Sequence, residues 1–359
     1  MIVNRRVYIL EEFTRFGGGQ TVFESVYNGL KGVSLNVHVV TDRNHRFLPS
    51  YIPDDSVIET GLKDPHWDRP ALLFPKIIGL KRELKQIVPY GLTFNNHPNV
   101  FVFNATINFW HEVFGFMVQR PGRTDKIALS FVRKTGLFRE YNGAYFLTNG
   151  KFTGRQIRET FSYLGVSKLT IEQVDLPVMI PDKVCLDRKE RVVLTFGRIS
   201  PDKSLESALE IALRVKDVRF VIAGRVLERD RRYLEMLDKE KGENVSIIPN
   251  PSAEVKDSLY RKAKVYLHTK RNENYGISVA EAISYGCCPV VPKEGGAYED
   301  VLMAGALGYG YSNTEEAVQF VRQAIEASIS ELENIFVTRE RFFPEKFAVR
   351  LSESFNKFI

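Results

Sequence analysis

The second half of the chain alternates short apolar runs with amphipathic helical patterns, and this alternation restricts the possible folds. The apolar runs lie at 191–197, 219–224, 245–250, 264–269 and 287–292, and helical patterns separate them. Strands separated by helices at this spacing predict βαβ units, which form a parallel sheet with helices on both faces. In such sheets ligands bind beyond the carboxyl ends of the strands.

The first half repeats this organisation less regularly. Strands are predicted at 6–10, 35–41, 99–104 and 144–149, and a helix follows the loop FGGGQ. A chain of 359 residues is long enough for two domains, and two prolines interrupt the pattern at 174–184. We therefore predict an α/β protein with an N-terminal domain at 1–175, a C-terminal domain at 176–338 and a final amphipathic helix within 339–359.

The net charge of +6 belongs to the first half of the chain. Residues 1–175 carry 22 Lys and Arg against 16 Asp and Glu (+6), and residues 176–359 carry 28 against 28 (zero). This asymmetry indicates either a solvated basic surface or an anionic partner, although no nucleic-acid-binding module is recognisable. No apolar run is long enough to span a membrane, and three cysteines without metal spacing indicate a reduced, cytoplasmic compartment.

Two loops after predicted strands contain residues suited to phosphate. Gly18 and Gly19 of FGGGQ precede a helix whose N-terminal N–H groups would attract an anion, although a tight turn explains these glycines equally well. In FGRISPDKSLE, Arg198 and Lys203 would neutralise a diphosphate, whereas Ser204 as an N-cap would make this an ordinary helix start. A third loop, KEGGAYEDV, contains a glycine pair that permits close backbone approach or forms a plain turn.

The stretch NENYGISVAE contains two glutamates and has two interpretations. In the purely structural one, Ser278 and Glu281 form a capping box and Glu273 is a solvated loop acid. In the functional one, N–H groups of 274–277 face phosphate, and the two carboxylates accept hydrogen bonds from vicinal hydroxyl groups.

Together these motifs resemble glycosyltransferase family 4, whose members have the GT-B fold of two Rossmann-like domains facing each other across a deep cleft. RNENYGISVAEAISYGCCPVVPKEGG resembles the family's E-x₇-E region, FGRISPDKS its Arg…Lys diphosphate motif, and TNGKFTGRQIRETF the segment before its linker. Within the family, GGGQTVFESVYNGL and HTKRNENYGISVAE are most similar to the GDP-mannose α-1,2-mannosyltransferases of asparagine-linked glycan synthesis.

The resemblance implies a retaining glycosyltransferase that moves a sugar, with mannose from GDP-mannose favoured, to a glycan or polyprenyl-linked saccharide. It implies no cofactor and no metal, and the chain has no D-x-D motif. It assigns catalysis to Glu273 at the donor sugar and to Arg198 and Lys203 at the leaving diphosphate. The other donor-binding residues that it implies are Gly18, Gly19, Gly224, Arg225, Asn274, Tyr275, Gly276, Ile277 and, at the ribose hydroxyls, Glu281.

Many members of this family carry a first-domain histidine near the reaction centre. Here His111 is favoured over His97 because it lies beyond the predicted strand 99–104, but a structural histidine beside aromatic residues is the alternative. The basic first domain would hold the acceptor and contact the cytoplasmic face of a membrane peripherally; nucleic acid is not an expected partner. Two other functions remain open: transfer from a UDP-sugar, and non-catalytic binding of a sugar nucleotide.

Overall fold

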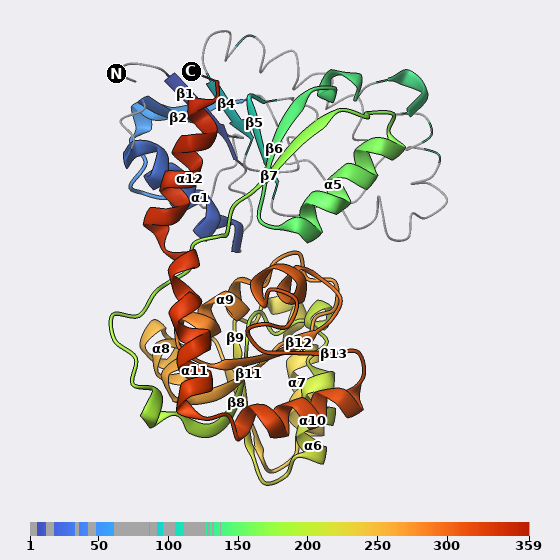
Figure 1. The fold of residues 1–359 in the computed structure, drawn as a ribbon, viewed down its shortest axis with the longest axis vertical. Coiled ribbons are helices and arrows are strands. Elements are labelled where there is room, and N and C mark those ends of the chain that lie inside the picture. The colour runs from blue at the N-terminus through green and yellow to red at the C-terminus, as the bar shows by residue number, and fades with distance from the viewer. Residues whose placement is uncertain are drawn as a thin grey trace. The chain divides into compact units, whose positions relative to one another are not determined.

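The computed structural model describes nearly all of the chain after residue 138 and several segments before it (Figure 1). The described residues are 6–11, 18–32, 36–41, 48–60, 86, 92–95, 105–110, 127, 130, 133–136 and 138–358. The chain divides into two compact units, one of Met1–Pro177 with Pro344–Ile359 and one of Val178–Phe343. The boundary between the units lies between Pro177 and Val178, within the proline-containing stretch 174–184 where the sequence predicts a linker.

A parallel sheet with the strand order β3-β2-β1-β4-β5-β6-β7 forms the centre of the first unit in its described part. Its strands are β1 (Arg6–Leu10), β2 (Asn36–Thr41), β3 (Val57–Glu59), β4 (Leu92–Asn95), β5 (Ile107–Trp110), β6 (Ala144–Thr148) and β7 (Leu169–Gln173). Helices of the same unit are α1 (Gly18–Gly32), α5 (Lys151–Tyr163) and α12 (Pro344–Asn356). The predicted strand 99–104 lies outside the described residues.

The last helix, α12, packs against α1 although the two are far apart in the sequence (Figure 1). α1 buries Val22, Val26 and Leu30 at the four-residue spacing of one helix face. At Gly29 an added Cβ would already lie 3.4 Å from Leu351 Cδ2 on α12. A single methyl group at Gly29 would thus already contact α12, and α12 belongs to the first unit.

The second unit contains a parallel sheet with the order β10-β9-β8-β11-β12-β13. Its strands are β8 (Glu190–Phe196), β9 (Arg219–Gly224), β10 (Val245–Pro249), β11 (Ala263–Leu267), β12 (Cys288–Pro292) and β13 (Tyr309–Tyr311). Its helices are α6 (Glu206–Arg214), α7 (Arg231–Glu240), α8 (Ala253–Lys262), α9 (Ile277–Ser284), α10 (Thr314–Ile325) and α11 (Ile329–Phe336). Because helices alternate with parallel strands as the sequence predicts, the α/β fold class is confirmed.

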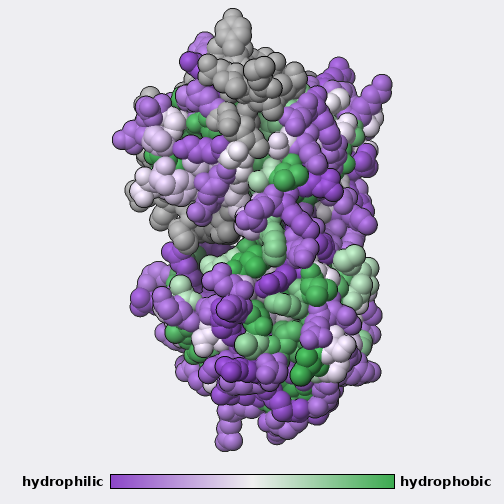
Figure 2. Space-filling model, turned by 60° about the vertical axis from the view of Figure 1, so that its left-hand side comes forward, coloured by the Kyte–Doolittle hydropathy of each residue, from purple (hydrophilic) through white to green (hydrophobic). Residues whose placement is uncertain are grey.

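The surface is polar over much of its described area. On the face drawn in Figure 2, hydrophilic residues predominate and apolar residues lie between them. In the segments that the structure describes, none of the helices combines the length and the apolar character needed to cross a membrane.

Candidate active site

Loops that follow four strands of the second sheet are joined at its carboxyl edge. Parallel strands end at the same edge, so residues far apart in the sequence come together there. The joining hydrogen bonds run from Ile199 N to Arg225 O (2.8 Å), from Thr269 Oγ1 to Lys203 O (2.7 Å) and from Gly296 N to Glu273 O (2.7 Å).

Glu273 lies among cationic and imidazole groups at this edge, with 15% of its side chain exposed. Its Oε2 is 2.7 Å from Lys203 Nζ and 3.7 Å from His268 Nε2, and its Oε1 is 3.4 Å from Lys270 Nζ. Burial alone would raise the pKa of the carboxyl, but Lys203, Lys270 and His268 outweigh it and lower that pKa to about 2. Glu273 is therefore an ionised, partnered carboxylate and not a solvated loop acid.

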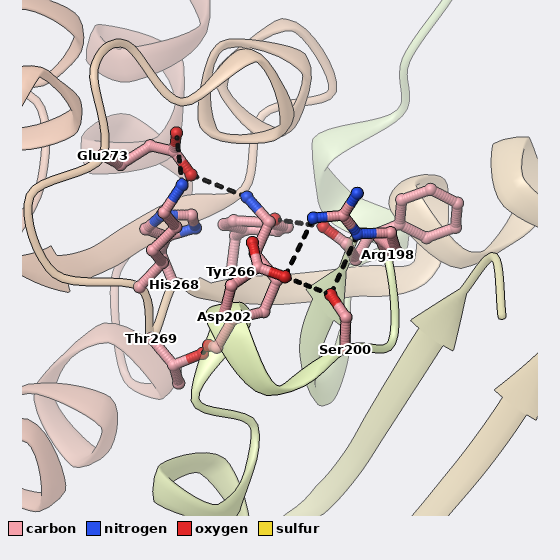
Figure 3. A network of polar contacts seen from close by, with 10 residues as sticks. Arg198, Ser200, Asp202, Tyr266, His268, Thr269 and Glu273 are labelled. Atoms are coloured by element: carbon pink, nitrogen blue, oxygen red, sulfur yellow. Dashed lines mark hydrogen bonds and ion pairs between the residues drawn. The ribbon is translucent and has the colours of Figure 1, made fainter. Parts of the chain in front are cut away.

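His268 is a site residue that the sequence does not reveal. It follows β11 directly and is 5% exposed, and Figure 3 shows it beside Glu273. Burial, with Lys203 and Lys270 nearby, lowers the pKa of the imidazole to about 4 although Glu273 opposes this. His268 is thus neutral at physiological pH. Its position at the end of a strand in KVYLHTK is the one signal that the sequence offers.

Arg198 is oriented by two neighbours on its own loop (Figure 3). Its Nε donates to Ser200 Oγ (3.0 Å) and its Nη2 to Asp202 Oδ1 (2.8 Å), while Ser200 Oγ donates to the same Oδ1 (2.6 Å). Burial favours a higher pKa for Asp202, but the hydrogen bond from Ser200 and the charge of Arg198 lower it overall. Asp202 is therefore ionised and holds the guanidinium in place.

The expected N-cap at Ser204 is wrong. Ser204 follows the short helical turn Pro201–Lys203 in a left-handed conformation (φ 50°), and α6 begins two residues later without a side-chain cap. The hydroxyl of Tyr233 accepts the N–H of Leu205 (2.8 Å) instead. A tertiary contact thus satisfies an N–H group at the helix start, and local sequence cannot indicate it.

The predicted capping box of Ser278 and Glu281 is also wrong. α9 begins at Ile277, and its N-cap is Gly276, which has no side chain to make a capping bond. Glu281 is buried at 9% exposure, where its Oε1 accepts from Lys256 Nζ (2.6 Å) and its Oε2 from the Tyr260 hydroxyl (3.1 Å). Two residues of α8 thus hold the buried carboxylate of Glu281 in the interior of the second unit, and capping does not explain this residue.

Glycines allow the loops around Glu273 to pack backbone against backbone. Gly276 has φ 91°, a left-handed conformation that turns the chain into α9. An added Cβ at Gly295 would lie 2.7 Å from Glu273 O, and one at Gly296 only 2.0 Å from Asn274 O. This packing fixes the start of α9, whose first N–H groups have no partner within the helix and favour an anion.

The predicted donor-binding residues around α9 differ in exposure. Tyr275 is buried at 2% exposure and is part of the core. Asn274 and Ile277 are partly exposed on either side of it. The donor-binding roles of these three residues remain predictions.

Gly224 ends β9 and Arg225 follows it, beside the loop that contains Arg198. A Cβ at Gly224 would lie 1.5 Å from Gly197 O, so close packing of two strand ends by itself requires this glycine. Arg225 is exposed, and its backbone O accepts from Ile199. The next turn joins them because Asn250 N donates to Gly224 O (2.8 Å).

The first-unit candidates are described only in part. Gly18 and Gly19 form the start of α1, which begins earlier than predicted, inside the loop FGGGQ. His97 and His111 both lie outside the described residues, in the gaps on either side of the described segment 105–110. The roles proposed for these four residues remain predictions.

The sequence of this chain is similar to a known protein family and to curated proteins. Residues 180–342 match the family described as glycosyl transferases group 1. The chain is 26% identical over 235 residues to the α-1,3/1,6-mannosyltransferase ALG2 of Homo sapiens, covering 57% of this chain and 56% of that protein. It is 26% identical over 209 residues to the GDP-Man:Man(3)GlcNAc(2)-PP-Dol α-1,2-mannosyltransferase of Caenorhabditis elegans, covering 51% and 43%. The chain thus spans about half the length of these curated relatives.

The fold has similar solved structures. The Anabaena protein Alr3699/HepE in complex with UDP and glucose superposes with a TM-score of 0.68 at 14% identity, covering 98% of this chain and 100% of that one. This likeness, with two parallel α/β sheets, identifies the fold as GT-B. The motifs at the sheet edge lie within residues 180–342, the part of the chain that matches the glycosyl transferases group 1 family.

Proposed function

We propose that the chain is a retaining, metal-independent glycosyltransferase that transfers mannose from GDP-mannose to a glycan or lipid-linked saccharide. The observation that carries this proposal is the joining of Glu273, Lys203 and the start of α9 at one sheet edge within a glycosyl transferases group 1 domain. Relatives with this domain are named as mannosyltransferases, which favours mannose as the sugar.

The leaving nucleoside diphosphate gains negative charge as its bond to the sugar breaks. Arg198, Lys203 and the N–H groups at the start of α9 are the groups that stabilise this charge, without a bound cation in the proposed mechanism. Arg198 is oriented by Asp202 through a 2.8 Å hydrogen bond, so its remaining donors are available in a fixed direction.

The carboxylates recognise hydroxyl groups. Glu273, ionised and held beside Lys203, accepts hydrogen bonds from the donor sugar. Glu281 takes the ribose hydroxyls, with each of its oxygens able to accept further bonds besides those from Lys256 and Tyr260. Glu273 is ionised at neutral pH, and neither residue needs to act as a nucleophile.

The acceptor belongs to the first unit in this proposal. The excess of Lys and Arg over Asp and Glu within residues 1–175 suits a phosphate-bearing, lipid-linked saccharide and peripheral contact with a membrane. Flotation with anionic and neutral vesicles tests the contact, and equal, negligible binding to both would contradict it.

A panel of GDP- and UDP-sugars, each scored for release of the nucleoside diphosphate with and without EDTA, tests the whole proposal. Release from GDP-mannose that EDTA leaves unchanged is the expected result. Preference for a UDP-sugar would show that the donor is a UDP-sugar and not GDP-mannose. This is the second candidate because the structurally similar Alr3699/HepE was solved in complex with UDP. Binding of a nucleotide without release from any donor would identify a non-catalytic sugar-nucleotide-binding protein.

A further inference from the structure

The backbone of His268 is fixed in place, but the ring nitrogen Nε2 makes no hydrogen bond to the described residues. Its backbone N donates to Val290 O (2.9 Å) and its backbone O accepts from the Tyr311 hydroxyl (2.8 Å), which anchors the residue between β12 and β13. Its Nε2 is fully buried and has no hydrogen-bond partner in the described part of the chain. A buried polar atom without a partner destabilises a fold, so a polar ring here calls for a reason.

The group that faces this nitrogen is the carboxylate of Glu273. His268 Nε2 lies 3.7 Å from Glu273 Oε2, which is beyond hydrogen-bond distance. The same Oε2 accepts from Lys203 Nζ at 2.7 Å. Lys203 thus holds this oxygen in the structure, and His268 Nε2 faces the same oxygen from a longer distance.

Lys203 has a second role in the proposed function, because it also meets the donor diphosphate. Its backbone is held by Thr269 Oγ1, which donates to Lys203 O at 2.7 Å, and the four-carbon stem of a lysine can move the ammonium group while the backbone stays in place. A diphosphate that draws Nζ away from Glu273 leaves Oε2 without its closest donor. Lys270 stays at Oε1, 3.4 Å away, and does not replace it.

We propose that His268 is a positioning residue that takes over Glu273 Oε2 when Lys203 turns to the donor diphosphate, and so aims the carboxylate at the donor sugar. This inference rests on the proposed function. The movement required is small, since closing 3.7 Å to a hydrogen bond of about 3 Å takes a shift of under ~1 Å. The neutral imidazole has one N–H, so the exchange needs no protonation, in keeping with a pKa of about 4.

The test compares His268→Gln with His268→Met. Glutamine places its amide nitrogen near the position of Nε2 and keeps a donor, while methionine fills the space without one. With GDP and GDP-mannose as probes, His268→Met should leave GDP affinity within about twofold and lower GDP-mannose affinity and turnover by about 10- to 100-fold, the size of a hydrogen bond to a charged group. His268→Gln should restore most of this loss.

The acid limb of the pH–rate profile gives a second readout. Among the described residues, Lys203, Lys270 and His268 are the groups whose charges lower the pKa of Glu273, and the phenol of Tyr266 also interacts with its charge. If Lys203 is engaged by the diphosphate, losing His268 removes a donor from the carboxylate, so the acid limb should move to higher pH in His268→Met. An unchanged limb contradicts the positioning role.

His38 provides a matched control, because its Nε2 is also buried without a partner in the described residues but lies on β2 of the first unit. His38→Met should change stability but leave the ratio of the GDP and GDP-mannose affinities unchanged. Equal losses for the two nucleotides in His268→Met, or no rescue by glutamine, would overturn the inference.

Two further outcomes are distinguishable. If His268→Met does not fold, His268→Asn replaces it, since asparagine is too short to reach Oε2, and equal activity of the Asn and Gln variants then rejects the role. If the unaltered protein binds neither GDP nor UDP, the proposed function fails; if it transfers sugar and His268→Met does so equally well, only this inference fails.

Discussion

Replacing Lys203 by methionine tests whether Glu273 is an internally paired carboxylate. The pKa of Glu273 falls from 4.5 to about 2, a fall of about 2.5, and Lys203 is the largest favourable cause. At about 1.4 kcal/mol for each pKa unit, the folded protein gains roughly 3 kcal/mol from keeping this carboxylate ionised. Because burial alone raises the pKa, Lys203→Met should lose about 2 to 4 kcal/mol of stability at pH 7.

The sign of the pH dependence follows from the same values. A pKa that is depressed in the folded protein adds stability above pH 4.5, and this stability is lost as the pH falls from 4.5 toward 2. The difference in the free energy of unfolding between the parent protein and Lys203→Met should therefore be largest at neutral pH and become small near pH 2.

Native-state hydrogen exchange in β11 and α9 is the suitable assay, because it reports opening free energy within the second unit. Tryptophan fluorescence does not serve, since Trp67 and Trp110 both belong to the first unit. Lys262→Met is the control: its 3.7 Å pair with Glu190 is exposed and should contribute little. A Lys203→Met effect below about 0.5 kcal/mol, or one equal at pH 7 and pH 3, would refute the reasoning.

Two more substitutions address the loops and the second glutamate. Gly296→Ala places a Cβ 2.0 Å from Asn274 O, so it should displace the loop and abolish GDP binding in a calorimetric titration. The control is Gly32→Ala, whose Cβ would have nothing within 4 Å and which should bind GDP normally. Equal GDP affinities of the two variants would contradict this prediction. Glu281→Gln should weaken GDP binding by about 10-fold or more through loss of charged hydrogen bonds to the ribose. Unchanged GDP affinity would show that Glu281 serves only to pair Lys256, 2.6 Å away.

The sequence predicts much of the second sheet because its strands have strong local signals. The predicted runs at 191–197, 219–224 and 287–292 overlap β8, β9 and β12, each of which is largely buried. β13 is only three residues long (Tyr309–Tyr311), too short for any period to appear, and it is absent from the prediction. Strand signals thus scale with the length of the buried run.

The site residues divide in the same way. Arg198, Lys203 and Glu273 could be named from loop position and chemical type, because strand order brings the loops to one edge. The partners of Glu281 could not, since Lys256 and Tyr260 come from a different helix and depend on how α8 packs. Capping motifs failed for a related reason: they are local patterns, and tertiary contacts replaced them.

Internal pairing changes how donor recognition at this edge should be understood. Lys203 is neutralised by Glu273 at 2.7 Å and Lys256 by Glu281 at 2.6 Å, so the donor meets ion pairs and not free charges. In the proposed function, donor binding is an exchange of partners at Lys203, in which a phosphate oxygen replaces the carboxylate of Glu273 and the released carboxylate turns to a hydroxyl group of the sugar. This exchange keeps the number of buried charge contacts nearly constant, which lowers the desolvation cost of binding a dianion. The exchange also couples the two halves of the donor, because Glu273 becomes available to the sugar only when the diphosphate has engaged Lys203. A nucleotide and a sugar presented separately should therefore bind less well than the intact donor, by more than the lost contacts of either fragment.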